Sequence, residues 1–146
     1  MTLDGLEQHG AAAPPGCIRV LVVDDDRQIG ARLRELLTDF DHTVVGLASN
    51  SLQAMVLIKA LNPDVVVTDL RMPGMSGLQL AAEATRLPNP PEVIVVSAYD
   101  DASLMDEARD AGAHAYLVKG SSGERIHEAV VAAAAARSAR VAGTTL

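Results

Sequence analysis

Acidic, hydroxyl and amine side chains stand at the ends of four short apolar segments of the sequence. They are Asp24, Asp25 and Asp26 after segment 18–23, Asp69 after segment 64–68, Ser97 at the end of segment 92–97, and Lys119 after segment 115–118. Carboxylate oxygens are hard ligands that suit Mg²⁺, and a carboxylate can also attack phosphorus. An ammonium or a hydroxyl can donate a hydrogen bond to an anionic oxygen. If the four ends meet, these residue types predict a site that holds a metal ion and a phosphoryl group against a carboxylate nucleophile.

The segments before these residues have the pattern of buried parallel strands. Five short Val-rich runs alternate with five amphipathic stretches, and the runs are 18–23, 43–48, 64–68, 92–97 and 115–118. Runs that are apolar almost throughout are typical of strands covered on both faces, and their alternation with helices indicates βαβ units. We therefore predict an α/β, doubly wound (βα)5 domain, a three-layer sandwich around a parallel sheet. Ligands of such folds bind at the carboxyl ends of the strands, so the four segment ends should meet in one cleft.

Each of these residues has a simpler explanation when it is taken alone. An Asp after a strand is usually a turn residue or a helix cap, and we expect Asp26 to cap the helix that follows it. A single lysine or serine would most often be a solvated surface residue. An acidic pair, a further Asp, a Ser and a Lys at four strand ends, in this order, favour the functional explanation.

Length and composition are those of one acidic globular domain. The chain has 146 residues, of which 49% are hydrophobic, and a formal net charge of −7. This charge repels nucleic acid and anionic lipid, so we expect no direct binding to either. There is no apolar run long enough to span a membrane, no secretion signal and no second cysteine beside Cys17, which together favour a cytoplasmic protein. We expect a flexible leader over 1–16, one domain over 17–137, and a tail or the start of a linker over 138–146.

Four longer motifs carry a resemblance to a known family. They are VLVVDDD at 20–26, PDVVVTDLRMPGMSG at 63–77, VIVVSA at 93–98 and AGAHAYLVK at 111–119. Over residues 18–137 the chain resembles the response-regulator receiver domains of two-component signalling, the CheY-like superfamily. The resemblance implies a flavodoxin-like fold with the sheet order 2-1-3-4-5. It also implies that Asp69 accepts a phosphoryl group from a sensor histidine kinase or from a small phosphodonor.

The resemblance further implies a metal site beside Asp69. Asp25 would bind Mg²⁺ directly, and Asp24 would bind it through water. Asp69 itself and the backbone carbonyl of Arg71 would be the other protein ligands, and Mn²⁺ could substitute for Mg²⁺. No other cofactor is implied.

Three further residues take on roles by the same resemblance. Ser97 would hydrogen-bond the attached phosphoryl group, and Lys119 would contact one of its oxygens. Tyr116 stands where the family has an aromatic ring that changes rotamer on phosphorylation. These movements would alter the face made by the helix after Ser97, the strand 115–118 and the last helix, through which the family's habits suggest a homodimer.

The sequence departs from the commonest receiver pattern at several positions. Gly120 follows Lys119 where many receivers have proline, so we expect no proline-imposed cis bond and a more permissive loop. Together with the segment around Arg71, this feature is closer to the FixJ/NarL-like transcriptional subgroup. Arg71 and Tyr99 occupy the two variable positions beside the phosphoryl site, where large side chains would shield an acyl phosphate from water. We therefore expect slow autodephosphorylation.

Two kinds of output fit the resemblance, and two other functions fit the fold less well. The chain would control transcription through a DNA-binding domain that it does not contain, or act as a stand-alone receiver or phosphorelay intermediate. A phosphatase with an aspartyl nucleophile would need a second acid where Arg71 stands. A flavin or nucleotide module would need a glycine-rich loop where the three acidic residues follow the first strand. We therefore expect a signalling domain and not an enzyme, apart from its own phosphorylation and autodephosphorylation.

Overall fold

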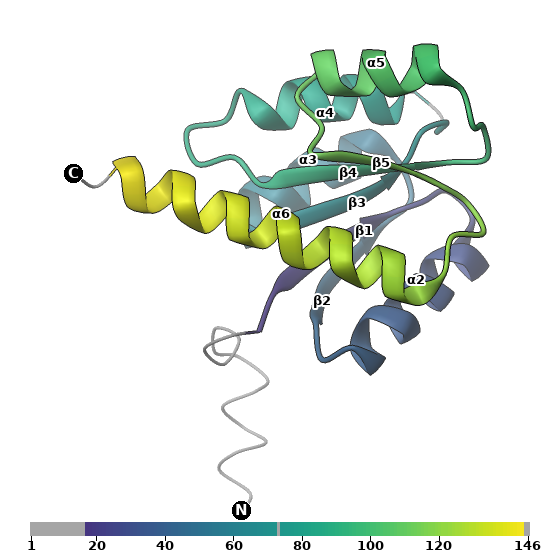
Figure 1. Cartoon of the computed structure of the whole chain (residues 1–146), viewed down its shortest axis with the longest axis horizontal. Helices are drawn as coiled ribbons and strands as arrows, with labels where there is room; N and C mark the ends of the chain where they lie inside the picture. Colours follow the sequence, from purple (N-terminus) through teal and green to yellow (C-terminus); the bar gives the residue numbers. More distant parts are fainter. Residues whose placement is uncertain (1–16, 73, 145–146) are drawn as a thin grey trace, which may run out of the picture.

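The computed structural model describes residues 17–72 and 74–144. Strands and helices alternate along the whole of this part of the chain (Figure 1). They are β1 (Arg19–Val23), α2 (Arg27–Asp39), β2 (Thr43–Ala48), α3 (Ser51–Leu61), β3 (Val65–Asp69), α4 (Gly77–Thr85), β4 (Glu92–Ser97), α5 (Ala102–Asp110), β5 (Ala115–Val118) and α6 (Gly123–Thr144). The leader predicted over 1–16 lies outside the described residues.

The five strands form one parallel sheet in the order β2-β1-β3-β4-β5. Helices α3, α4 and α5 cover one face of this sheet, and α2 and α6 cover the other (Figure 1). The predicted (βα)5 three-layer sandwich and its 2-1-3-4-5 strand order are therefore confirmed. Every strand runs in the same direction, so all five carboxyl ends lie at one edge of the sheet.

The core has two halves, one on each face of the sheet. Successive strand residues point to opposite faces: in β1, Val20 and Val22 pack with α2 and α6, whereas Leu21 and Val23 pack with α3, α4 and α5. All four side chains are buried. Full burial of a Val or Leu side chain contributes about 1.5–3 kcal/mol, which explains why these apolar runs fix the strand positions so firmly.

Helix α2 begins where the sequence predicted a cap. The Asp26 carboxylate accepts hydrogen bonds from the backbone N–H groups of Gln28 at 2.9 Å and Ile29 at 3.2 Å. These bonds satisfy N–H groups that have no partner within the helix. The capping role of Asp26 is confirmed, and this residue belongs to the helix start rather than to the group of facing carboxylates.

The last helix continues past the predicted end of the domain. α6 runs without a break through Arg137 to Thr144. Arg137, whose side chain is 12% exposed, bonds to the carboxylate of Asp64 at 2.9 Å and to the carbonyl of Pro90 at 3.1 Å. These contacts attach α6 to the edge of the sheet opposite the carboxyl ends. The domain limits 17–137 and 138–146 stay a prediction.

Two histidines meet between α6 and the start of β2. His42 is 7% exposed, and its Nε2 lies 2.8 Å from Nδ1 of His127. The ring of Phe40 stacks on that of His127, with the ring centres 4.4 Å apart. α6 brings His127 onto the segment between α2 and β2, a contact that the positions of the two histidines along the sequence do not predict.

Acidification should weaken the fold through His42. Burial, followed by the charge of His127, lowers the pKa of His42 below its ordinary value of 6.5, and Asp41 only partly opposes this. The unfolded chain therefore binds a proton at His42 before the folded chain does, so stability falls as pH drops from about 6.5 through the lowered pKa. We expect urea unfolding to show a smaller loss of stability between pH 7.5 and pH 5.5 in His42→Gln than in the natural chain. Equal losses in the two chains would contradict this.

Candidate functional site

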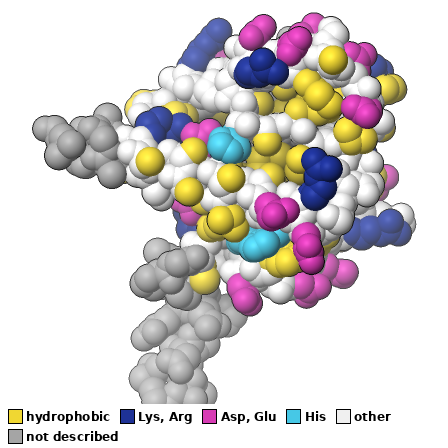
Figure 2. All heavy atoms as spheres, in the orientation of Figure 1, with side chains coloured by type: hydrophobic (Ala, Val, Ile, Leu, Met, Phe, Trp, Pro, Cys, Tyr) yellow, Lys and Arg dark blue, Asp and Glu magenta, His cyan; other side chains and the backbone are white. Residues whose placement is uncertain are grey.

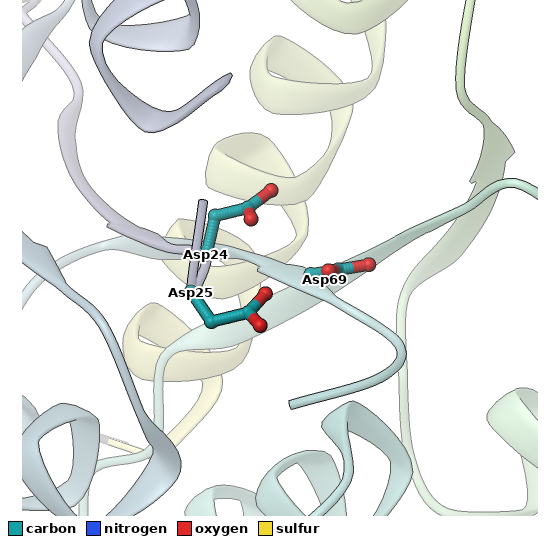
Figure 3. Close-up of side chains that lie close together, drawn as sticks. All are labelled: Asp24, Asp25 and Asp69. Carbon is teal, nitrogen blue, oxygen red and sulfur yellow. The ribbon is translucent and has the colours of Figure 1, made fainter. Parts of the chain in front are cut away.

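Residues from four strand ends meet at the carboxyl edge of the sheet. Asp24 and Asp25 follow β1, Asp69 ends β3, Ser97 ends β4, and Lys119 follows β5. β1 and β3 are neighbours whose register pairs Val23 with Thr68, so the next residue of each strand is an acid beside an acid. Figure 3 shows the carboxylates of Asp24 and Asp25 extending toward Asp69. One carboxylate oxygen from each lies within 4.8 Å of the other two.

Asp24 is the most deeply buried carboxylate of the three, with 6% of the residue exposed. Burial is the main reason why its pKa is raised above the usual value, and the charges of Asp69 and Asp25 act in the same direction. The backbone N–H of Asp26, which donates to Oδ1 of Asp24 at 2.9 Å, and the ammonium of Lys119 oppose the rise. The positive charge near Asp24 therefore does not offset its burial and the negative charge of the two neighbouring carboxylates.

This donor set fits a hard divalent cation. It offers three carboxylates and no sulfur or imidazole, and the described residues contain no other group of three such ligands. Mg²⁺ prefers oxygen ligands, takes one or two carboxylates from a protein, and fills its other positions with water or phosphate oxygens. The chain therefore has the residues that a magnesium site needs.

Asp69 has a cation beside it as well as the two acids. The ammonium Nζ of Lys119 lies 3.3 Å from Oδ1 of Asp69, which is 8% exposed. The backbone N–H of Lys119 donates to the carbonyl of Ser97 at 2.6 Å and so holds the lysine against β4. Gly120, next in sequence, has a φ of +93°, a conformation that glycine adopts without strain. The backbone at this position therefore suits glycine, and no cis peptide bond occurs among the described residues.

Ser97 lies under the same edge of the sheet with only 1% of its surface exposed. Its Oγ accepts a hydrogen bond from the backbone N–H of Tyr99 at 3.1 Å. A hydroxyl that accepts one bond can still donate another. The hydrogen bond from Tyr99 therefore leaves the Ser97 hydroxyl proton unused.

Tyr99 contacts both Arg71, the other predicted modulator, and Tyr116, the predicted switch residue. The guanidinium carbon of Arg71 lies 4.6 Å from the centre of the Tyr99 ring, a cation–π contact. The hydroxyl of Tyr116 donates to the backbone carbonyl of Tyr99 at 2.6 Å, and the Tyr116 ring packs against the core on the α3, α4 and α5 face. The sequence placed Arg71 and Tyr99 beside the phosphoryl site and treated Tyr116 apart from them, but it did not predict the contacts of Tyr99 with the other two.

Comparison with known proteins gives a consistent result. Residues 20–131 match the family described as the response regulator receiver domain. The chain is 38% identical, over 88% of its length, to the positive alginate biosynthesis regulatory protein of Pseudomonas aeruginosa, of which the match covers 52%. It is 34% identical to the chemotaxis protein CheY of Thermotoga maritima, over 77% of this chain and 93% of that protein. The chain spans about half the length of the curated transcriptional regulators that it matches.

A solved structure extends this likeness to the fold. The signal receiver domain of the response regulator NarL from Mycobacterium tuberculosis superposes with a TM-score of 0.78 at 36% identity, covering 82% of this chain and 98% of that one. This likeness agrees with the FixJ/NarL-like subgroup that the sequence favoured. Within residues 17–72 and 74–144, no helix has the length and the apolar character needed to cross a bilayer.

Proposed function

The chain belongs to the response regulator receiver domain family of two-component signalling, and we propose that Asp69 is the residue that accepts the phosphoryl group. The observation that carries this proposal is the position of the Asp69 carboxylate, which lies among two further carboxylates and 3.3 Å from the Lys119 ammonium. A carboxylate oxygen of Asp69 would attack the phosphorus of a phosphohistidine or of a small acyl phosphate. The new phosphorus–oxygen bond forms as the bond to the donor's nitrogen or oxygen breaks, and the donor keeps that electron pair.

Asp25, Asp69 and the backbone carbonyl of Arg71 would hold Mg²⁺ in this site, Asp24 would hold it through water, and Mn²⁺ could replace it. When bound, the cation would neutralise negative charge on the carboxylates and on the phosphoryl oxygens. The chain's own residues orient the carboxylates and add positive charge beside Asp69. The N–H of Asp26 fixes the Asp24 carboxylate, and Lys119 supplies a positive charge that is aimed at Asp69.

Ser97 and Tyr116 would convert the new charge into a change of shape. The attached phosphoryl group carries about two negative charges, and the Ser97 hydroxyl would donate to one of its oxygens. A shift of Ser97 would disturb its bond with the N–H of Tyr99, whose carbonyl holds the Tyr116 hydroxyl. Tyr99 thus offers a direct mechanical link from the phosphoryl site to Tyr116.

The donor would be a sensor histidine kinase, and the output would be transcription through a DNA-binding domain outside this chain. The other output is that of a stand-alone receiver or phosphorelay intermediate, and the chain also matches a chemotaxis protein CheY over 93% of that protein's length. A homodimer through α5, β5 and α6 and a cytoplasmic location belong to the same proposal.

The net charge of −7 argues against nucleic-acid binding by this chain. On the face in Figure 2, described basic side chains stand apart among acidic and apolar ones.

Incubation of the whole chain with a small acyl phosphate, with and without Mg²⁺, tests the proposed function. We expect intact-mass analysis to show one added phosphoryl group that is formed only with the metal. The linkage should behave as an acyl phosphate, and borohydride reduction followed by peptide mapping should place it on Asp69. The matching variant is considered in the Discussion.

Arg71 and Tyr99 should slow the loss of the phosphoryl group. An exposed cation–π contact is worth about 0.5–1 kcal/mol, so removing it should speed hydrolysis by about two- to fivefold if the contact closes the site to water. We expect a shorter phosphoryl half-life in Arg71→Ala and in Tyr99→Ala, and no additional effect in the double variant because the two act as one pair. Arg86→Ala, at an exposed arginine on the end of α4, is the control. An unchanged half-life in both single variants would refute shielding.

A further inference from the structure

The first residue of α4 lies directly against the backbone of Asp69. Gly77 is buried, and its N–H donates to the carbonyl of Leu70 at 2.7 Å. A methyl group on Gly77 would overlap the carbonyl oxygen of Asp69 and would lie 3.1 Å from the carbonyl carbon of Asp69 and from Cα of Leu70. Carbon atoms in contact are normally 3.5–4.0 Å apart. Only a hydrogen atom fits between α4 and the residue that carries the proposed nucleophile.

The Asp69 side of this contact is held by the sheet. Asp69 pairs with Val96 of β4, and the next N–H, that of Leu70, donates to the Val96 carbonyl at 3.1 Å. The hydroxyl of Thr68, which has no exposed surface, donates to the Asp69 carbonyl at 3.0 Å. The peptide of Asp69 therefore has partners on two sides, and moving it would disturb both.

The α4 side is held equally firmly. Ser76 and Gln79 form a reciprocal capping box that orders the first turn of the helix. Leu80, Ala81 and Ala84 have no exposed surface and pack into the core. Since neither partner can yield freely, the distance between them is set by the size of residue 77. Gly77 is not among the described glycines with a positive φ, so space and not backbone conformation is what an alanine would lack.

We propose that Gly77 is a positioning residue for phosphoryl transfer. By letting α4 lie against the Asp69 peptide, it sets where the Asp69 carboxylate meets Asp24, Asp25 and Lys119. Gly77 touches no reacting atom and acts only through Asp69. This inference rests on the proposed function and adds to it a requirement at a residue outside the site.

Gly77→Ala tests the inference against two other glycine-to-alanine changes. We expect its phosphorylation by a small acyl phosphate to be about 10–100-fold slower, as when a group that orients a metal ligand or a reacting group is displaced. Mg²⁺ affinity of the unphosphorylated chain, measured from amide shifts in NMR, should weaken as well. In Gly46→Ala the new methyl group meets the ends of flexible side chains, Leu21 Cδ1 at 3.3 Å being the nearest. That variant should keep both values within twofold of the natural chain.

Gly30→Ala is expected to stabilise the fold, so the double variant Gly30→Ala/Gly77→Ala offsets stability that Gly77→Ala loses. Nothing lies within 4 Å of a methyl group at Gly30 in α2, and alanine is favoured over glycine inside a helix. Slow phosphorylation in a folded Gly30→Ala/Gly77→Ala chain supports the inference. A rate within twofold of Gly46→Ala overturns it. Loss of the fold in both backgrounds also overturns it, because Gly77 would then be needed for folding. If Asp69→Asn takes up no phosphoryl group while Gly77→Ala is phosphorylated at the rate of the natural chain, the proposed function of Asp69 stands and the inference about Gly77 is wrong.

Discussion

A chain carrying Asp69→Asn is expected to take up no phosphoryl group under conditions that label the natural chain fully. The amide has neither the charge nor the nucleophilic oxygen of a carboxylate, so no acyl phosphate can form at this position. The change should leave the fold intact, because the side chains have nearly the same size. It also removes one of the charges that raise the pKa of Asp24. Intact-mass analysis after incubation with a small acyl phosphate and Mg²⁺ measures the result.

Asp26→Asn is the matched control for this substitution. Asp26 lies two residues after Asp24 but caps α2 instead of joining the three facing carboxylates, and asparagine caps helices as well as aspartate does. This variant should be labelled like the natural chain. Full labelling of Asp69→Asn, or a label mapped to Asp24 or Asp25 in the natural chain, would remove Asp69 from its proposed role.

The strands could be predicted closely because burial on both faces leaves a clear mark in the sequence. Segments 43–48, 92–97 and 115–118 agree with β2, β4 and β5, and the other two differ only at their ends. The third predicted segment ended at Thr68, whereas β3 includes Asp69, whose backbone still pairs with β4. An acidic residue reads as the end of an apolar run even where the strand continues.

The grouping of site residues was predictable for a topological reason. In a parallel sheet with crossover helices, every strand delivers its last residue to the same edge, so Asp24, Asp69, Ser97 and Lys119 had to lie near one another. The contacts between loops carry no such signal. Arg71 and Tyr99 lie in different loops, and the Arg71 guanidinium contacts the Tyr99 ring. The sequence pattern of neither loop predicts this contact. The same holds for His42 and His127, which are 85 residues apart.

Space requirements were also invisible in the sequence. Gly77 was part of a family motif, but the motif gives no reason for a glycine there. The reason lies in how closely α4 approaches the Asp69 carbonyl, and this depends on core packing by Leu80, Ala81 and Ala84. A one-dimensional pattern records which residues are apolar and at what spacing, but not how near two backbones come.

Lys119→Met should slow phosphorylation of Asp69 by about 10²–10³-fold, the usual cost of removing one preorganised group that stabilises charge in a transition state. Methionine keeps a long flexible side chain without the ammonium that lies 3.3 Å from Asp69. The backbone N–H that bonds to the Ser97 carbonyl is unchanged, so the end of β5 should stay in place. Single-turnover rates with a small acyl phosphate measure the effect.

The chain's other lysine separates this local effect from the loss of one positive charge. Lys59 is exposed on α3, and Lys59→Met changes the net charge of −7 by the same amount as Lys119→Met. Long-range attraction of an anionic donor would be weakened similarly by both substitutions and would fade with added salt. A rate that falls only in Lys119→Met, and that stays low at high salt, assigns the effect to the ammonium beside Asp69. Equal rates in the two variants would instead show that Lys119 contributes only to the overall field.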